Sequence, residues 1–154
     1  MNNLTKYIIV FLIINFLALA LGNWLMAGGP QKDWYLSLNK APWTPPGWVF
    51  GAAWFTIMVC FSIFMAYLYK LHPKPEVIIL FIVQFLLNVS WNYVFFNRHL
   101  IGIGFIVILM LTAVVSIFMV LYQKTLGTTT LLIIPYFIWL LIASSLNGYI
   151  FFKN

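Results

Sequence analysis

Residues 77–96 read VIILFIVQFLLNVSWNYVFF, an unbroken run without a charged side chain. An α-helix needs about 20 mostly apolar residues to cross the hydrocarbon core of a bilayer. The segment therefore predicts a membrane-spanning helix. A strand of a membrane barrel is not predicted, because apolar and polar residues do not alternate along the run.

The rest of the chain has the same character. It is 64% hydrophobic and 6% charged over 154 residues, whereas soluble domains carry about 25% charged residues. Further uncharged stretches flank the first one, and together they predict helices at about 7–27, 47–69, 77–96, 101–123 and 130–152. The predicted fold is an all-α integral membrane protein, a bundle of five transmembrane helices with a structured first long loop, forming one domain over residues 1–154. The first helix is expected to be retained, because its apolar run is longer than the roughly 7–15 residues of a secretory signal.

The charged residues lie in the connectors and at the ends, and the net charge is +6. Contact with lipid headgroups accounts for this charge, so the bilayer is the expected partner. Nucleic acid is not expected, because the chain offers no folded basic platform. The positive-inside rule gives no orientation. One side of the membrane collects Lys6, Lys70, Lys74 and Lys124, and the other collects Lys32, Lys40, Arg98 and Lys153.

The connector between the first two predicted helices is long and rigid. It leads into residues 37–55, which read SLNKAPWTPPGWVFGAAWF. Thr44 is a favourable N-cap and Pro45 a natural first helical residue, so they predict the start of the second helix. The aromatic residues Trp34, Tyr35 and Trp43 fit either an anchor at the membrane surface or a lid over the bundle. The pattern alone leaves both open.

Polar, small and bulky aromatic residues share single faces of the predicted helices. The faces are formed by Asn15, Ala18 and Gly22; by Gly47, Gly51, Trp54, Phe55 and Met58; by Gln84, Asn88, Trp91, Asn92 and Phe95; and by Trp139, Ala143 and Asn147. Pro135 should bend the last helix. Ordinary helix packing accounts for Asn15, Ala18, Gly22 and Gly47, because small residues allow close approach and amides bond across helices.

The tryptophans fit packing less well, because each is bulky and has an N–H that needs a partner. Trp54, Trp91 and Trp139 directed to a common centre would wall an apolar pocket for a small molecule. No ionisable residue lies inside a predicted span, unlike in proton pumps and voltage sensors. The sequence shows no cluster that could bind a metal and no nucleophile–base pair. This inventory favours a flat aromatic ligand held by stacking and shape.

Three blocks, WYLSLNKAPWTPPGWVFGAAW, QFLLNVSWNYVFF and PYFIWLLIASSLNGYIFFKN, cover residues 34–54, 84–96 and 135–154. In this order they resemble the signature blocks of the TspO/MBR family, which includes bacterial tryptophan-rich sensory proteins and the mitochondrial translocator protein. The resemblance implies a bundle that is usually dimeric and whose first long connector closes over a pocket. It also implies location in a bacterial cell membrane. Phe151 departs from the family, which often has a tryptophan there.

The same resemblance implies binding of porphyrins such as protoporphyrin IX, and of isoquinoline or benzodiazepine-type drugs. No covalently bound cofactor is expected. Light-dependent degradation of protoporphyrin is implied for bacterial members, and Trp54 and Trp139 match the tryptophans that carry it. Pattern and resemblance together nominate as ligand-binding residues Tyr35, Phe50, Gly51, Trp54, Phe55, Asn88, Trp91, Phe95, Trp139, Ala143 and Asn147.

Three functions remain open at this stage. The first is a porphyrin receptor with possible photochemistry, in which Lys32, Lys40 and Arg98 would meet the ligand's carboxylates. The second is a carrier of porphyrin, sterol or another small hydrophobic molecule, although the sequence shows no internal repeat of the kind common in transporters. The third is a structural or partner-recruiting role, which would leave the aligned tryptophans unexplained.

Overall fold

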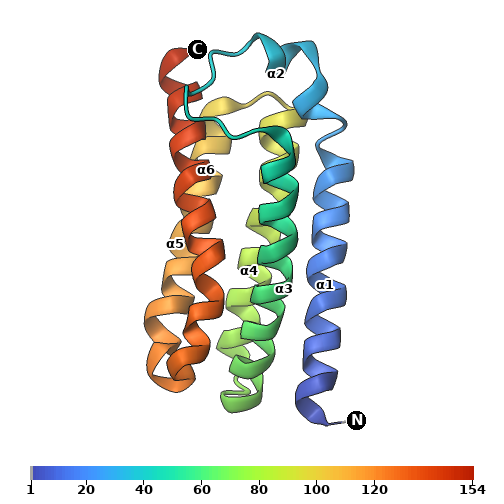
Figure 1. Ribbon diagram of the computed structural model, residues 1–154, viewed down its shortest axis with the longest axis vertical. Coiled ribbons are helices and arrows are strands. Elements are labelled where there is room, and N and C mark those ends of the chain that lie inside the picture. The colour runs from blue at the N-terminus through green and yellow to red at the C-terminus, as the bar shows by residue number, and fades with distance from the viewer. Residues whose placement is uncertain (1) are drawn as a thin grey trace.

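The computed structural model describes residues 2–154. Within that range the chain forms five long helices and no strand (Figure 1). The long helices are α1 (Asn3–Leu25), α3 (Gly47–Leu71), α4 (Pro75–Asn92), α5 (Ile101–Leu126) and α6 (Ile134–Lys153). Shorter turns are η1 (Gly29–Gln31), α2 (Asp33–Ser37), the π-helical η2 (Tyr93–Asn97) and the 3₁₀-helical η3 (Gly127–Ile133). The predicted five-helix bundle is confirmed.

The helices lie along one another, and the first long connector crosses one end of the bundle. In Figure 1 this connector, with η1 and α2, runs over the top from α1 to α3, close to the C-terminal end of α6. The N-terminus and the α3–α4 link lie at the opposite end. We call these the lid end and the N-terminal end. α1 packs against α3 and α4, and α5 packs against α4 and α6.

The outside of the bundle is apolar, as a bilayer requires. Side chains such as Leu17, Leu86, Ile106 and Val120 are exposed on the surfaces of α1, α4 and α5. The described residues contain four stretches long and apolar enough to cross a membrane, and the last, Ile101–Lys153, contains both α5 and α6. The chain is therefore a multi-pass integral membrane protein.

Buried polar side chains bond between helices. Asn15 Nδ2 donates to Ser62 Oγ at 2.8 Å, which joins α1 to α3. Gln84 Nε2 donates to the hydroxyl of Tyr136 at 2.7 Å, which joins α4 to α6. A Cβ on Gly22 would lie 2.7 Å from Asn92 Nδ2, so this glycine allows the close approach of α1 and α4. The packing interpretation of Asn15 and Gly22 is confirmed.

Two predictions about prolines were wrong, one on a helix start and one on a helix bend. α3 begins at Gly47 with Pro46 as its N-cap, and the hydroxyl of Thr44 instead donates to the carbonyl of Ala41 at 2.7 Å. A proline disfavours helical backbone at the residue before it, so Pro46 keeps Pro45 out of the helix and the helix starts beyond the pair. Pro135 does not bend a continuous helix, because it lies in the first turn of α6, where its missing N–H is no loss.

Candidate ligand cavity

A cavity of about 970 Å³ occupies the lid end of the bundle. Its walls come from α1, α3, α4, η2, α5 and α6, and the first connector covers it with Pro30, Gln31, Tyr35, Lys40 and Thr44. The volume lies at the upper end of the roughly 300–1,000 Å³ typical of small-molecule sites. The connector is therefore a lid over the bundle, which answers the choice that the sequence left open.

The cavity gathers ten of the eleven nominated residues, which come from segments far apart in the sequence. They are Tyr35, Phe50, Gly51, Trp54, Asn88, Trp91, Phe95, Trp139, Ala143 and Asn147. Phe55 is not among them. Its side chain is 58% exposed and lies edge-on to Phe16 of α1 at a centroid distance of 5.5 Å. At about 100° per residue, Phe55 is turned away from the face that presents Trp54.

Gly47 and Gly51 lie in the cavity wall and are not packed against a neighbouring side chain. A Cβ built on either glycine would meet no atom within 4 Å. Gly47 therefore does not have the packing role that the sequence suggested. Both glycines leave room inside the cavity, because neither places a side chain there.

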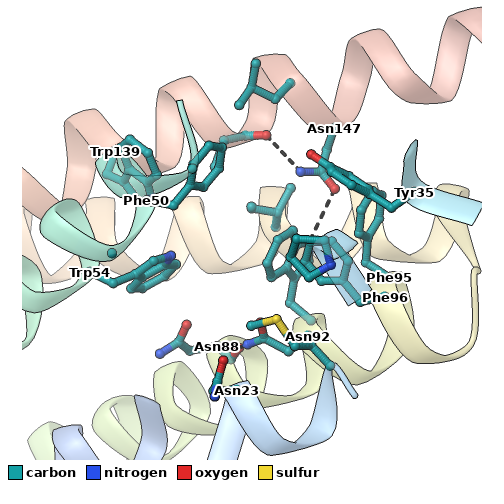
Figure 2. Close-up of a pocket in the computed structure, with 18 of the residues that line it drawn as sticks. Asn23, Tyr35, Phe50, Trp54, Asn88, Asn92, Phe95, Phe96, Trp139 and Asn147 are labelled. Carbon is teal, nitrogen blue, oxygen red and sulfur yellow. Dashed lines mark hydrogen bonds between the residues drawn. The ribbon is translucent and has the colours of Figure 1, made fainter. Parts of the chain in front are cut away.

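Trp54 and Trp139 lie in the wall of the cavity (Figure 2). Trp139 is 6% exposed and lies edge-on to Phe50 at 5.2 Å between centroids. Trp54 is half-buried and lies edge-on to Tyr136 at 6.0 Å. These edge-to-face contacts with neighbouring rings fix the positions of both indoles. Both indoles line the cavity, where a flat ligand can contact them.

Trp91 is held by a polar chain across the cavity wall. Its Nε1 donates to Asn147 Oδ1 at 3.3 Å, and Asn147 Nδ2 donates to the carbonyl of Ala143 at 2.9 Å. The Trp91 ring also stacks on Phe95, with an interplanar angle of 10°. Phe95 lies in the π-helical η2, and π turns of this kind are frequent at functional sites. These contacts fix the Trp91 indole, the Asn147 amide and the Phe95 ring relative to one another.

Carboxamides gather on the side of the cavity opposite Trp139 and Phe50 (Figure 2). Asn23, Asn88 and Asn92 all line the cavity, and Asn88 is only 6% exposed. Asn92 Nδ2 donates to the backbone carbonyl of Asn88 at 3.1 Å. Amide groups supply both donors and acceptors. This side can therefore bond a polar group of a ligand whose body rests on the aromatic side.

Sequence reasoning placed Asn92 on the correct face of its helix but did not nominate it. Asn23 and Thr44 were also missed. Asn23 follows the Asn15–Gly22 stripe of α1, which is the weak signal that was available. The sequence around Thr44 indicated a helix N-cap instead, so it gave no sign that this residue lines a cavity.

Lys40 is the cationic residue that lines the cavity. Its Nζ donates to the backbone carbonyls of Tyr35, Leu36 and Leu38 at 3.0, 3.1 and 3.3 Å, and lies 5.1 Å from the centroid of the Tyr35 ring. The ammonium thereby holds the C-terminal end of α2. Lys32 and Arg98 do not line the cavity, so the sequence suggestion of three basic residues at the ligand reduces to Lys40.

Aromatic contacts and hydrogen bonds fasten the lid to the rest of the bundle. Trp34 stacks on His99 at 4.0 Å between centroids, and the Nε1 of Trp43 donates to Ser145 Oγ at 3.1 Å. The backbone N–H of Asn39 donates to Asn154 Oδ1 at 2.9 Å, and Asn154 Nδ2 donates back to the carbonyl of Asn39 at 3.3 Å. The lid is therefore tied to the α4–α5 link and to the end of α6.

Tyr35 joins the lid to the cavity. Its ring lies 5.3 Å from that of Phe96, and burial raises the pKa of its hydroxyl above the usual value of 10. Burial penalises the charged form of the phenol. The group is therefore neutral throughout the physiological range, and it can donate a hydrogen bond.

These features define a class: a multi-pass membrane protein whose helix bundle holds a lid-covered cavity with tryptophan in its walls. The chain belongs to the TspO/MBR family, whose model matches residues 10–152.

The relatives come from bacteria, archaea and animals. The chain is 34% identical to protein CrtK of Rhodobacter capsulatus over 118 residues, which is 74% of each chain. It is 27% identical to the tryptophan-rich protein TspO of Archaeoglobus fulgidus over 146 residues, 92% of this chain and 94% of the relative. It is also 27% identical to the human translocator protein over 124 residues, 77% of this chain and 73% of the relative. With bacterial relatives among these, the chain is placed in a bacterial cell membrane.

Proposed function

We propose that the cavity is a receptor site for a flat hydrophobic molecule, with protoporphyrin IX as the natural class of ligand and isoquinoline or benzodiazepine-type drugs as synthetic ones. The single observation that carries the proposal is a lid-covered cavity of about 970 Å³ with Trp54, Trp91 and Trp139 in its walls. Indole rings in a cavity wall suit stacking against a planar conjugated ring.

The polar groups fit the periphery of such a ligand. Carboxamides on one side offer hydrogen bonds to polar substituents, and Lys40 places a positive charge beneath the lid. A ligand carboxylate at Lys40 would replace one of the three backbone carbonyls that its ammonium now contacts. Binding of an acidic porphyrin would thus be coupled to the position of α2.

We extend the proposal to light-driven loss of bound porphyrin, with Trp54 and Trp139 as the residues involved. A bound porphyrin that absorbs light can sensitise oxygen, and an indole held against it is the nearest oxidisable group. Trp139 is fixed by Phe50 and Trp54 by Tyr136, so both stay in place beside a ligand. We also propose that the protein acts as a homodimer.

Transport is the alternative function, and the name of the human relative, translocator protein, favours it. A ligand crossing through the bundle would have to pass the N-terminal half, where Phe61, Phe64 and Phe118 are fully buried. Close packing of this kind resists passage, because interiors have few voids larger than a water molecule. Binding is therefore the function that the geometry supports better.

The test is a titration of detergent-solubilised protein with protoporphyrin IX in darkness, followed by tryptophan fluorescence. The same samples are then illuminated in air, and the porphyrin absorbance is recorded. We expect saturable quenching, and light-driven porphyrin loss that Trp54→Phe and Trp139→Phe abolish. The matched control is Trp24→Phe, which removes an indole that is 73% exposed and outside the cavity.

Each result has a distinct meaning. Saturable binding without protein-dependent loss in light would remove the photochemistry and leave the receptor. Net movement of porphyrin into sealed vesicles containing the protein would favour the carrier instead. Quenching that never saturates would contradict the receptor itself.

A further inference from the structure

A second hollow lies on the outside of the bundle, towards the N-terminal end. It is a groove of about 560 Å³ between α1 and α4, with α3 behind it. Its floor is formed by the rings of Phe11 and Phe81, which meet edge-on at 5.1 Å and are almost fully buried. Val10 and Ile82 form its edges and are half exposed, so the groove opens towards the surrounding lipid.

The groove runs along the helices from the membrane surface inwards. On α1 it extends from Tyr7 to Ile14, and on α4 from Ile78 to Phe85. Seven residues of helix rise by about 10 Å. A narrow apolar trench of this length and direction matches the upper part of a lipid acyl chain, which also lies along the bilayer normal.

Two lysines are chain neighbours of the residues at the surface end of the groove. Tyr7 and Tyr69 meet edge-on there at 5.2 Å, and the neighbouring residues in the chain are Lys6 and Lys70. Among residues 2–154, the ion pairs join Glu76 to Lys74 at 3.9 Å and to His72 at 3.6 Å, and leave Lys6 and Lys70 without a carboxylate partner. Lys6 and Lys70 thus each stand next in the chain to a tyrosine at the mouth of the apolar trench, close to the ends of α1 and α3.

We propose that this groove binds one anionic phospholipid, with an acyl chain in the trench and its phosphate at Lys6 and Lys70. Basic residues at the end of a membrane helix attract anionic headgroups. The hydroxyls of Tyr7 and Tyr69 add hydrogen-bond donors at the same level. This site lies outside the cavity under the lid and does not depend on the function proposed for it.

Charge also argues against a second copy of the chain as the occupant. A twofold dimer pairs the same surface of both subunits. With both copies inserted in the same direction, such an interface would bring Lys6 and Lys70 of each chain beside those of the other. Like charges placed together are unfavourable, whereas an anionic lipid neutralises them.

The test is native mass spectrometry of the full-length protein in micelles that contain equimolar phosphatidylglycerol and phosphatidylcholine with identical acyl chains. We expect one retained phosphatidylglycerol. The double variant Lys6→Gln/Lys70→Gln should lower the preference for phosphatidylglycerol by about fivefold per lysine removed. The matched control Lys32→Gln/Lys153→Gln removes the same charge at the lid end and should leave the preference unchanged.

A second variant separates the trench from the charge. Val10→Trp fills the groove from its exposed edge without altering charge, and should reduce retention of both lipids while thermal unfolding stays unchanged. Equal retention of the two lipids by the wild type, or a preference that survives Lys6→Gln/Lys70→Gln, would overturn the proposal. So would efficient disulfide cross-linking of Val10→Cys chains in native membranes, in a Cys60→Ala background, because it would show a second copy over the groove.

Discussion

The two halves of the bundle are built from the same helices, yet one is hollow and the other is solid. α3 shows the contrast most clearly. At the lid end it presents Gly47, Gly51 and Trp54 to the cavity. Two to three turns further on it presents Phe61, Phe64 and Met65, all fully buried. Side-chain volume along one helix face thus decides where the protein can bind a ligand and where its helices pack tightly.

The division has a physical logic. In a bilayer, apolar burial does not by itself drive helices together, so tight packing and interhelical hydrogen bonds must hold the bundle. The N-terminal half supplies both, through stacked phenylalanines and the bonds of Asn15 and Gln84. The lid end can then remain open, because its lid is fastened separately to α6 and to the α4–α5 link.

The largest expected effect separates the two halves by stability. Phe61→Ala should lower the free energy of unfolding by about 3–5 kcal/mol, because a fully buried ring leaves a cavity in a packed region. Phe50→Ala should cost about a third of that, since Phe50 already borders empty space. Thermal unfolding followed by circular dichroism measures both. Equal losses would break the distinction between a solid and a hollow half.

A smaller effect concerns how the lid is seated. A Cβ on Gly29 would collide with the side chain of Phe96, so Gly29→Ala should destabilise the protein by about 1–3 kcal/mol through overpacking. Gly47→Ala is the control, because its new methyl group meets nothing within 4 Å. The unfolding temperatures of the two variants measure this difference in stability. An unchanged value for Gly29→Ala would mean that the lid is not seated tightly on η2.

A smaller effect is expected when the hydrogen bonds between Asn39 and the end of α6 are removed. Asn39→Ala removes side-chain bonds that tie the lid to α6 and should weaken this closure by about 1 kcal/mol. A porphyrin held under the lid should then dissociate about fivefold faster. Stopped-flow fluorescence measures that rate, with Ser37→Ala as the control, since Ser37 bonds only locally to Trp34. An unchanged dissociation rate would show that this tie does not limit ligand exit.

The smallest effect near neutral pH is expected from the ionisation of Tyr35. Because burial raises its pKa in the folded state, its contribution to lid closure is present below pH 10 and is lost as pH rises through the higher folded value. Ligand affinity should therefore stay level from neutral pH up to pH 10 and fall only above it, as the phenol ionises. Tyr35→Phe should lose the alkaline component of that fall. An affinity that titrates near neutrality would point to a different group.

Much of this arrangement could be predicted from particular residues. Uncharged runs identified the five helices, and the shared faces of α4 and α6 placed Asn88, Trp91, Trp139 and Asn147 together. Periodicity failed at Phe55, because a residue at the edge of a face can turn either to the cavity or to the neighbouring helix. It also failed at Gly47, because a small residue looks the same whether it permits packing or leaves space. Lid residues such as Asn39 depend on contacts with distant segments, here with Asn154 at the end of α6, which no local pattern encodes.

The central claim is that the hollow half holds a flat ligand. It is tested most directly by titrating protoporphyrin IX in darkness into the wild type and into Gly51→Leu. The new side chain would extend into the cavity that Gly51 lines, since no atom lies within 4 Å of the position of its Cβ. We expect saturable binding by the wild type, and loss of that binding in Gly51→Leu with an unchanged unfolding temperature. Equal affinity in both proteins would contradict it, because the ligand would then be bound somewhere other than this cavity.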